Sequence, residues 1–313
     1  MPRYSSYIIV VLCFFYSLPS FALAKLGHQL VCQLAFEHLS NRNQKKIILL
    51  LGTIPLPTQQ HINRYNRVEK NTPISFSNAC TWADAIKKEP IYKKYKTWHY
   101  MNIPRSYSFI PKNSCLNNCL PQAIIQHQKL LSAKKAMPLY SDVITQTTAQ
   151  STQNSVWIKA KALMFLGHWL GDIHQPLHIS YASDLGGNKI SLKKKQGHCD
   201  NLHSYWDHCI LSLSKLTKAE WLAKLTSKWS EIVVPSYKED HVWHWANESY
   251  QTIIQPSFQY CNVILVQDQQ KLCQRPSGKV TLADNYHDQH LPLLALQLVK
   301  AAKRLTSVLE ASL

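Results

Sequence analysis

The sequence predicts a mostly α-helical protein with a single domain. Apolar residues recur at spacings of three and four in several segments, whereas alternating strand patterns are scarce. No Gly/Ser/Pro-rich linker, low-complexity tract or internal repeat divides the chain. The longest apolar stripe lies near the C-terminus and consists of Leu294, Leu298, Ala301, Leu305 and Val308.

The N-terminal residues are predicted to be a signal peptide rather than part of the domain. A basic residue precedes the apolar run from Ile8 to Tyr16, and small residues follow, Ala22 and Ala24 among them. The run is too short for a membrane span and fits a cleaved export signal. We expect residues 1–22 to be removed and residues 23–313 to form the domain, although cleavage after Ala24 fits the pattern as well.

The remaining elements follow from periodicity and from turn residues. Helical patterns cover residues 30–35, 45–51, 121–133, 156–166, 218–229, 243–254 and 294–308. The best strand candidate is Lys189–Lys193. Loops are predicted at residues 71–77, 137–146 and 184–199, the last of which contains an Asp-Leu-Gly-Gly-Asn turn.

Eight of the nine cysteines lie outside the expected signal peptide. An even number in an exported chain favours disulfides, although sequence alone allows about 105 pairings. We expect the local pairs Cys115–Cys119, Cys199–Cys209 and Cys261–Cys273, which leave Cys32–Cys80. A zinc role for the cysteines is the rival interpretation, but no Cys-x-x-Cys pair occurs.

The chain is strongly basic, with 35 Lys and Arg residues against 18 Asp and Glu, a net charge of +17. Such a surface attracts polyanions, either nucleic acid or anionic lipid. Charge alone does not choose between them.

The stretch from Phe165 to His178 contains the densest set of potential metal ligands. His168 and Asp172 are four residues apart, so a helix places both on one face. Pro176 ends or kinks that helix, and His178 therefore leaves in another direction and can serve a second metal. Imidazole and carboxylate together indicate zinc, since calcium and magnesium prefer oxygen ligands. His174 is not expected to bind a metal, but to contact a ligand residue from behind or to pack against its neighbours.

Other short motifs carry the same residue types. They are Gly27-His28, Trp82-Ala-Asp84, Trp98-His99-Tyr100, Asp184-Leu-Gly-Gly-Asn188 and Asn201-Leu-His203-Ser-Tyr-Trp-Asp207. His203 and Asp207 repeat the four-residue spacing of the central pair.

In this order, the motifs resemble those of the zinc-dependent single-strand-specific nucleases, also called 3′-nucleotidase/nucleases. These enzymes share their fold with zinc phospholipase C. The resemblance runs from His28 to Asp207 and continues more weakly to the last helix. It implies a multi-helix phospholipase C/nuclease-like fold with a trinuclear zinc cleft.

The resemblance also implies the ligands of three Zn²⁺ ions. The first ion would bind Asp84, His99, His168 and Asp172. The second would bind His178, His203 and Asp207. The third would bind His28, Asp172 and the main-chain groups of the first mature residue. The family has tryptophan at that last position, where this chain has Leu23. Main-chain donors remain available with leucine, but only if cleavage follows Ala22.

The implied activity is hydrolysis of single-stranded DNA and RNA to 5′-phosphate products, together with removal of phosphate from 3′-nucleotides. Asp84, Asp172 and Lys87 would take part in catalysis, and Lys87 stands where the family usually has arginine. Lysine can contact phosphate only as a point charge. Tyr100 would stack on a base and Asn188 would bind its edge. Packing in the core is the alternative role of Tyr100.

We expect a secreted or periplasmic monomer without a stable membrane anchor. Two alternatives remain at this stage. One is a phospholipase C that uses the same three zinc ions. The other is a basic nucleic-acid-binding protein with structural zinc and no turnover. Structural zinc sites are usually closed and rich in cysteine, whereas these ligand sets are His and Asp.

Overall fold

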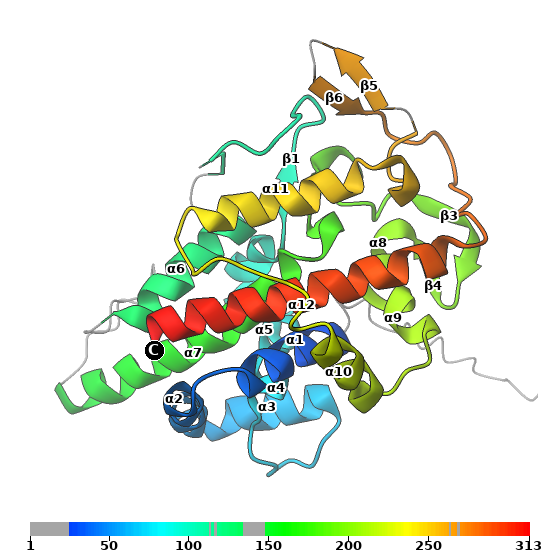
Figure 1. Cartoon of the computed structure of the whole chain (residues 1–313). Coiled ribbons are helices and arrows are strands. Elements are labelled where there is room, and N and C mark those ends of the chain that lie inside the picture. The colour runs from blue at the N-terminus through cyan, green and yellow to red at the C-terminus, as the bar shows by residue number, and fades with distance from the viewer. Residues whose placement is uncertain (1–24, 113, 116–117, 134–147, 263, 268–269) are drawn as a thin grey trace, which may run out of the picture.

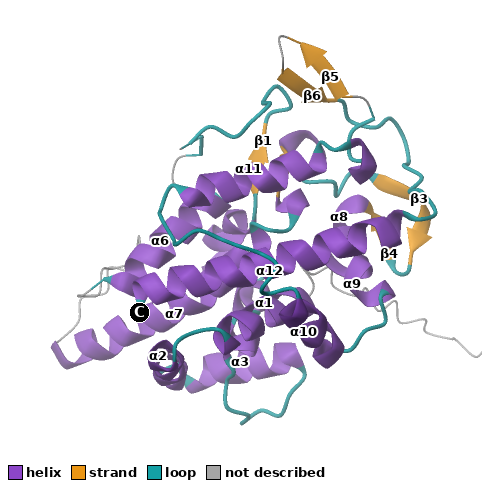
Figure 2. Ribbon diagram, in the orientation of Figure 1, coloured by secondary structure: helices purple, strands orange, loops and turns teal. Residues whose placement is uncertain are grey.

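Helices form most of the chain in the computed structural model, which describes residues 25–112, 114–115, 118–133, 148–262, 264–267 and 270–313 (Figure 2). This confirms the predicted fold class. The α-helices are α1 Lys25–Glu37, α2 Asn41–Gly52, α3 Leu56–Asn66, α4 Phe76–Ala79, α5 Trp82–Ile86, α6 Leu120–Ser132, α7 Thr148–Asp172, α8 Leu202–Ser204, α9 Ile210–Leu213, α10 Lys218–Ser227, α11 His241–Ile253 and α12 Tyr286–Ser312. None of the described helices is long and apolar enough to cross a membrane.

The central helix is α7, which packs against α6, α1, α5 and α12 (Figure 1). From Ala162 to Asp172 every residue is buried, so this part of the helix has no solvent-facing side. A helix that is buried all round lies in the middle of a bundle. Its C-terminal end, which carries His168 and Asp172, is therefore held by neighbours on several sides.

Helix α12 covers the core and begins earlier than the sequence indicated. The predicted stripe started at Leu294, but the helix starts at Tyr286 and includes Pro292. Proline is tolerated near a helix start because the first N–H groups have no partner within the helix. Here it stands at the seventh residue, where it removes one helical hydrogen bond, and the helix continues through it.

The strands are short. They are β1 Met101–Ile103, β2 Ile179–Tyr181, β3 Ser191–Gln196, β4 Cys199–Asn201, β5 Ile264–Gln267 and β6 Gln270–Cys273. The β3–β4 and β5–β6 pairs lie at the edge of the molecule, whereas β1 lies behind α11 and its partner β2 is buried (Figure 2). β1 and β2 form a parallel pair in which Met101 is opposite Ile179, and the other two pairs are antiparallel. Because His99 and His178 just precede β1 and β2, this pairing brings the two imidazoles to the same end of the small sheet.

Turns of non-α helix connect these elements. They are the 3₁₀ helices η1 Pro90–His99, η2 Pro176–His178, η3 Ala182–Asp184 and η5 Pro256–Phe258, and the π-helix η4 Tyr205–Cys209. Other elements also differ from the prediction. The strand expected at Lys189–Lys193 is β3, which runs from Ser191 to Gln196, and α7 begins at Thr148 rather than near residue 156. Helix α3 was not predicted because its apolar pattern is weak. The predicted loop at 137–146 lies outside the described residues.

Four disulfides join the eight cysteines in the expected pairs, Cys32–Cys80, Cys115–Cys119, Cys199–Cys209 and Cys261–Cys273. Cys32 on α1 and Cys80 after α4 are both fully buried against α7. The last disulfide closes the base of the β5–β6 hairpin.

Candidate metal centre

The C-terminal turn of α7 presents His168 and Asp172 side by side, with His168 Nε2 3.2 Å from Asp172 Oδ2. The backbone carbonyl of Cys80 accepts a hydrogen bond from His168 Nδ1 at 2.7 Å. Nε2 is therefore the nitrogen that points into the centre, where it also lies 3.2 Å from His99 Nδ1. Gly167 permits this close approach, because a Cβ there would lie only 2.8 Å from Cys32 Sγ.

Asp172 is the hub of the cluster. Its carboxylate lies 3.1 Å from His99 Nδ1, 3.1 Å from His178 Nδ1 and 3.5 Å from His28 Nε2, in addition to its contact with His168. These imidazoles come from α1, η1, η2 and α7. Asp172 is completely buried, so one carboxylate connects four segments of the chain.

Asp84 closes one side of this cluster. It lies near the start of α5, buried, with Oδ1 3.9 Å from both His99 Nδ1 and His168 Nε2. Potential ligand atoms of these three residues all lie within 4.8 Å of one another. Lys87, one turn along, donates to Asp84 Oδ1 at 2.9 Å.

A second group consists of His178, His203 and Asp207. Asp207 Oδ1 is 3.3 Å from His178 Nε2, and Asp207 Oδ2 is 3.0 Å from His203 Nε2. The sequence predicted an α-helical turn between His203 and Asp207, but η4 is a π-helix. A π turn still aligns residues four apart closely enough for contact, and such turns are frequent at functional sites.

A third group combines His28 with His168 and Asp172. The rings of His28 and His168 stack with centroids 3.6 Å apart. The family resemblance implies that His28 and Asp172 bind one ion together with the backbone of Leu23, which lies outside the described residues. His28 is on the first turn of α1 and fully buried, so the N-terminal end of α1 faces this group.

Several polar atoms of the cluster are buried without hydrogen-bond partners. They are both ring nitrogens of His28, Asp84 Oδ2, Asp172 Oδ1 and His178 Nδ1. Buried polar atoms in proteins are nearly always satisfied, so converging unsatisfied donors and acceptors need an explanation. Cations bound between the three groups would give such atoms a partner, and the His/Asp donor set suits zinc.

Mutual electrostatics keep the carboxylates ionised despite their burial. Burial alone raises the pKa of Asp172, but His168 and His178 outweigh it and hold that pKa well below the ordinary value. Burial also raises the pKa of Asp207, and His203 and His178 again outweigh it and lower the pKa well below the ordinary value. The carboxylates are thus charged and ready to bind a cation.

The pKa values of two imidazoles of the cluster, His178 and His28, are shifted in opposite directions. Burial lowers the pKa of His178, but the Asp172 and Asp207 carboxylates raise it to about 10. His28 has its pKa lowered to about 3, by burial first and by His168 second. Protons and metal ions compete for the same nitrogens, because a ligand imidazole must be neutral.

A pocket of about 540 Å³ opens over the cluster. Its lining residues are Lys87, Lys96, His99, Tyr100, Asn102, Leu177, His178, Leu185, Gly186, Asn188, His203 and Asp207. The predicted substrate residues Tyr100, Asn188 and Lys87 therefore line one cavity. The same cavity is lined by members of two of the three metal-ligand groups, namely His99 and the set His178, His203 and Asp207. Tyr100 is not a core residue, since its side chain is only partly buried.

Sequence reasoning missed several residues around the pocket. Asn102 is two residues after Tyr100 at the start of β1, and the period of two in a strand could have placed both on one face. Gln175 connects the chain just before His178 to Asp207. Its Nε2 donates to Asp207 Oδ1 at 2.6 Å, and its Oε1 accepts from the Leu177 amide. No local pattern distinguishes such a glutamine.

His174 does not join the cluster, in agreement with its predicted packing role. Its Nδ1 lies 2.7 Å from the Leu170 carbonyl and its Nε2 lies 2.8 Å from Arg304 Nη1. His198 approaches Cys199 and Cys209, but those sulfurs form a disulfide and offer no thiolate to a metal.

Comparison with known proteins agrees with this geometry. A family model described as S1/P1 Nuclease matches residues 24–313. The chain belongs to the S1/P1 nuclease family. Its relatives within this family include plant and fungal enzymes.

Endonuclease 2 of Arabidopsis thaliana is 26% identical over 314 residues, which cover 96% of this chain and 94% of that protein. Endonuclease 5 of the same plant is 29% identical over 74% of this chain and 75% of its own length. Nuclease P1 of Penicillium citrinum is 54% identical over 48 residues, 15% of this chain and 17% of that enzyme. As an S1/P1 family member, the protein is placed among nucleases, which are hydrolases.

Proposed function

We propose that the protein is an exported, zinc-dependent phosphodiesterase. It cleaves single-stranded DNA and RNA to products with 5′-phosphates, and it removes the phosphate of 3′-nucleotides. The observation that carries this proposal is the position of three converging His/Asp groups, linked by Asp172, beneath an open pocket.

Three Zn²⁺ ions are proposed to bind here. The first takes Asp84, His99, His168 and Asp172, the second takes His178, His203 and Asp207, and the third takes His28, Asp172 and the main chain of Leu23. When bound, zinc supplies Lewis-acid chemistry, lowering the pKa of water and stabilising negative charge on phosphate oxygens.

The chain's own groups bind and orient the substrate around this centre. Lys87 lines the pocket and is paired with Asp84, so its ammonium is available to contact a substrate phosphate as a point charge. Tyr100 offers an aromatic face on which a base stacks, which contributes about 1–3 kcal/mol for each base without regard to sequence. The side chain of Asn188 is held in the pocket wall by a hydrogen bond in which its Nδ2 donates to the Leu185 carbonyl at 2.8 Å.

This arrangement favours single strands over duplexes. A base must leave the stack to reach Tyr100 inside the pocket, and unpaired strands do so at lower cost. The net charge of +17 supports a polyanionic substrate. Four disulfides support export to an oxidising compartment, the secreted or periplasmic location expected from residues 1–22.

The proposal is tested by assaying three substrates side by side with zinc-loaded protein. They are a single-stranded oligonucleotide, a 3′-mononucleotide and phosphatidylcholine vesicles. We expect cleavage of the oligonucleotide with 5′-phosphate ends and release of phosphate from the mononucleotide. Hydrolysis of the lipid without cleavage of the oligonucleotide would assign the centre to a phospholipase C. Tight binding of the oligonucleotide without turnover would assign the protein as a binding module.

A further inference from the structure

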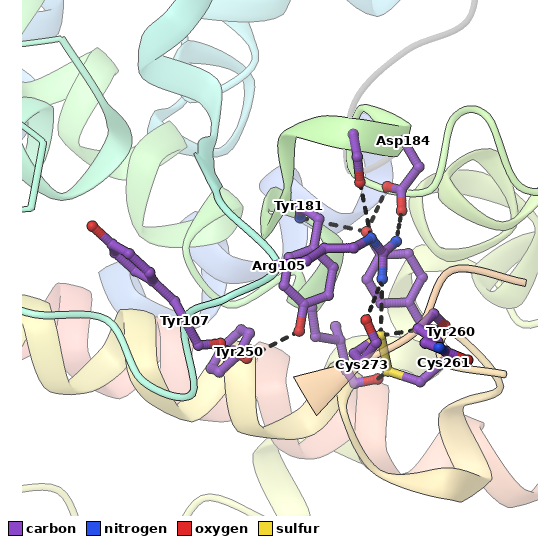
Figure 3. The surroundings of a disulfide bond; sticks show 11 residues. Arg105, Tyr107, Tyr181, Asp184, Tyr250, Tyr260, Cys261 and Cys273 are labelled. Carbon is purple, nitrogen blue, oxygen red and sulfur yellow. Dashed lines mark hydrogen bonds and ion pairs between the residues drawn. A yellow bond between two sulfur atoms is a disulfide. The ribbon is translucent and has the colours of Figure 1, made fainter. Parts of the chain in front are cut away.

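Arg105 lies two residues after β1 and connects three distant segments (Figure 3). Its Nε donates to Ser183 Oγ at 2.9 Å, its Nη1 donates to the Cys273 carbonyl at 2.9 Å, and its Nη2 pairs with Asp184. The flat guanidinium also covers the Tyr181 ring, 4.3 Å from its centroid. Only a planar group with several fixed donors can make these contacts at once.

Asp184 connects Arg105 to the loop formed by residues 184–188. It is completely buried, and while Oδ2 pairs with Arg105, its Oδ1 accepts from the Gly187 amide at 2.9 Å and from the Tyr260 hydroxyl at 2.6 Å. Burial and the Asp184 carboxylate raise the pKa of Tyr260 well above its ordinary value, so that hydroxyl remains a donor. Both carboxylate oxygens are thereby occupied.

The loop in turn contacts the metal-ligand group. The Gly186 carbonyl accepts a hydrogen bond from His203 Nδ1 at 2.7 Å, which leaves Nε2 directed at Asp207. Gly186 has φ +64°, and a Cβ there would lie 2.7 Å from the Leu177 carbonyl. The position of the Gly186 carbonyl therefore depends on the tight turn at residues 184–187, which the hydrogen bond between Asp184 and the Gly187 amide holds in place.

The other side of Arg105 rests on the β5–β6 hairpin. Cys273 supplies its carbonyl and, at 3.1 Å, its sulfur to Nη1, and the disulfide with Cys261 joins this point to the chain after η5. Tyr260, the neighbour of Cys261, bonds to Asp184 from the same side (Figure 3). The hairpin and the loop thus meet at one guanidinium.

We propose that Arg105 is a positioning residue for the proposed reaction. It ties the disulfide-closed hairpin to residues 184–188, and through the Gly186 carbonyl it orients His203, while Asn188 forms the pocket wall in the same loop. The catalytic consequence rests on the whole proposed function and the effect on zinc affinity rests on its metal centre, whereas the effect on the loop rests on neither. A salt bridge that only stabilises the fold is the competing explanation.

The test compares Arg105→Gln and Arg105→Lys with the wild type and with Arg275→Gln as a control. Arg275 is exposed and donates to the Lys189 carbonyl at 3.2 Å, so it lies nearby without touching Asp184. Zinc affinity is measured by competition with a chromophoric chelator, and amide hydrogen exchange is followed at Gly187. Oligonucleotide cleavage is measured at limiting and at saturating zinc.

Arg105→Gln should weaken the binding of one zinc ion by about 10-fold, the lower end of the effect of losing a partner behind a metal ligand, because the Gly186 carbonyl itself remains. Exchange at Gly187 should become faster, and cleavage should fall most at limiting zinc. Arg105→Lys should give an intermediate result, since an ammonium can hold Asp184 but cannot also reach Ser183 and Cys273. The control should match the wild type.

A lower melting temperature with unchanged zinc affinity and unchanged Gly187 exchange would overturn the proposal and leave a structural salt bridge. If Arg105→Gln does not fold, the same comparison is made with Arg105→Lys. Wild-type zinc affinity and wild-type Gly187 exchange in Arg105→Lys would likewise overturn the proposal. The wild type could also fail to cleave the oligonucleotide while Arg105→Gln alters zinc affinity and Gly187 exchange. That result would refute the proposed function and leave the positioning role of Arg105 standing.

Discussion

At the scale of residues, the centre depends most on Asp172. One buried carboxylate contacts His28, His99, His168 and His178, and it is the only proposed ligand shared by two metal ions. The four-residue spacing to His168 made the pair visible in the sequence. Its proximity to His28 and His99 was implied only by the family resemblance and not by spacing, because those residues lie on other elements far away in the chain.

Replacement of Asp172 by asparagine should lower cleavage of single-stranded DNA by at least about 100-fold. The amide keeps the size of the side chain but loses the charge that two cations require. Turnover and bound zinc are measured together, with Asp288→Asn as the control because its side chain is 90% exposed. Near-normal turnover in Asp172→Asn would show that the ligands are assigned wrongly.

His127 gives a prediction about pH. It is fully buried beside Trp98, Phe165 and Trp169, and burial lowers its pKa to about 4. Between the ordinary value near 6.5 and about 4, the unfolded chain takes up a proton that the folded chain does not. Its contribution to the free energy of unfolding is therefore present above this window and is lost as the pH falls through it.

His127→Phe should remove this contribution to the pH dependence, which is on the order of 3 kcal/mol across the window. Chemical denaturation at pH 7 and at pH 4.5 measures the difference between variant and wild type, so that carboxylates common to both cancel. His244→Phe at an exposed position is the control. Parallel pH curves for His127→Phe and the wild type would contradict the prediction.

At the scale of elements, the periodic helices were predictable and the pairings between elements were not. The apolar stripes of α1, α6, α7, α11 and α12 follow local spacing. The β1–β2 pair joins segments on either side of α6 and α7, and parallel pairing leaves little local trace. The π turn of η4 was missed because its residues have no spacing that distinguishes it from an α-helix.

Helix α7 packs closely against the Cys32–Cys80 disulfide, which joins α1 to the chain after α4, and Gly167 permits this close packing. Gly167→Ala should destabilise the protein by about 1–3 kcal/mol, because the new methyl group overlaps both sulfurs and the helix must move. It should also lower activity, since His168 is the next residue. Thermal unfolding and zinc content are measured, with the disulfide verified by thiol counting.

Gly52→Ala is the matched control for Gly167→Ala. Gly52 is the last residue of α2, and nothing lies within 4 Å of a Cβ placed there. This change should be neutral or stabilise by up to about 1 kcal/mol. Equal stability of the two variants would contradict the proposed close contact between α7 and the disulfide.

At the scale of the whole molecule, the ordered motifs indicated the family, and the structure shows why their order matters. His28, Asp84, His99, His168, His178, His203 and Asp207 come from seven different elements, and only the fold brings them together. The pocket wall was harder to predict. Lys96 and Leu185 line it, but in the sequence they look like an ordinary exposed lysine and an ordinary loop residue.

Basic charge close to the pocket should extend the binding of polynucleotides. Lys193, Lys194 and Lys195 are exposed on β3, which begins three residues after Asn188, and they form no ion pair with the described residues. Because each phosphate contact with a single strand adds about 0.7 to the salt slope, Gln at all three positions should reduce that slope by about 2. Hydrolysis of a 3′-mononucleotide should not change.

Affinity for a single-stranded oligonucleotide is measured between low and physiological salt. The control replaces the exposed lysines Lys45, Lys70 and Lys238 by Gln, none of which lines the pocket. If both triple variants reduce the slope equally, net charge rather than the position of β3 accounts for the effect, and the prediction is wrong.

The central claim is that the His/Asp cluster acts as a zinc centre for phosphodiester hydrolysis. The measurement that tests it most directly is cleavage of single-stranded DNA by chelator-stripped protein titrated with zinc, with bound zinc counted at each point. We predict no cleavage in stripped protein and full recovery as the count approaches three per chain. Full activity without zinc, or bound zinc without recovered activity, would contradict the account.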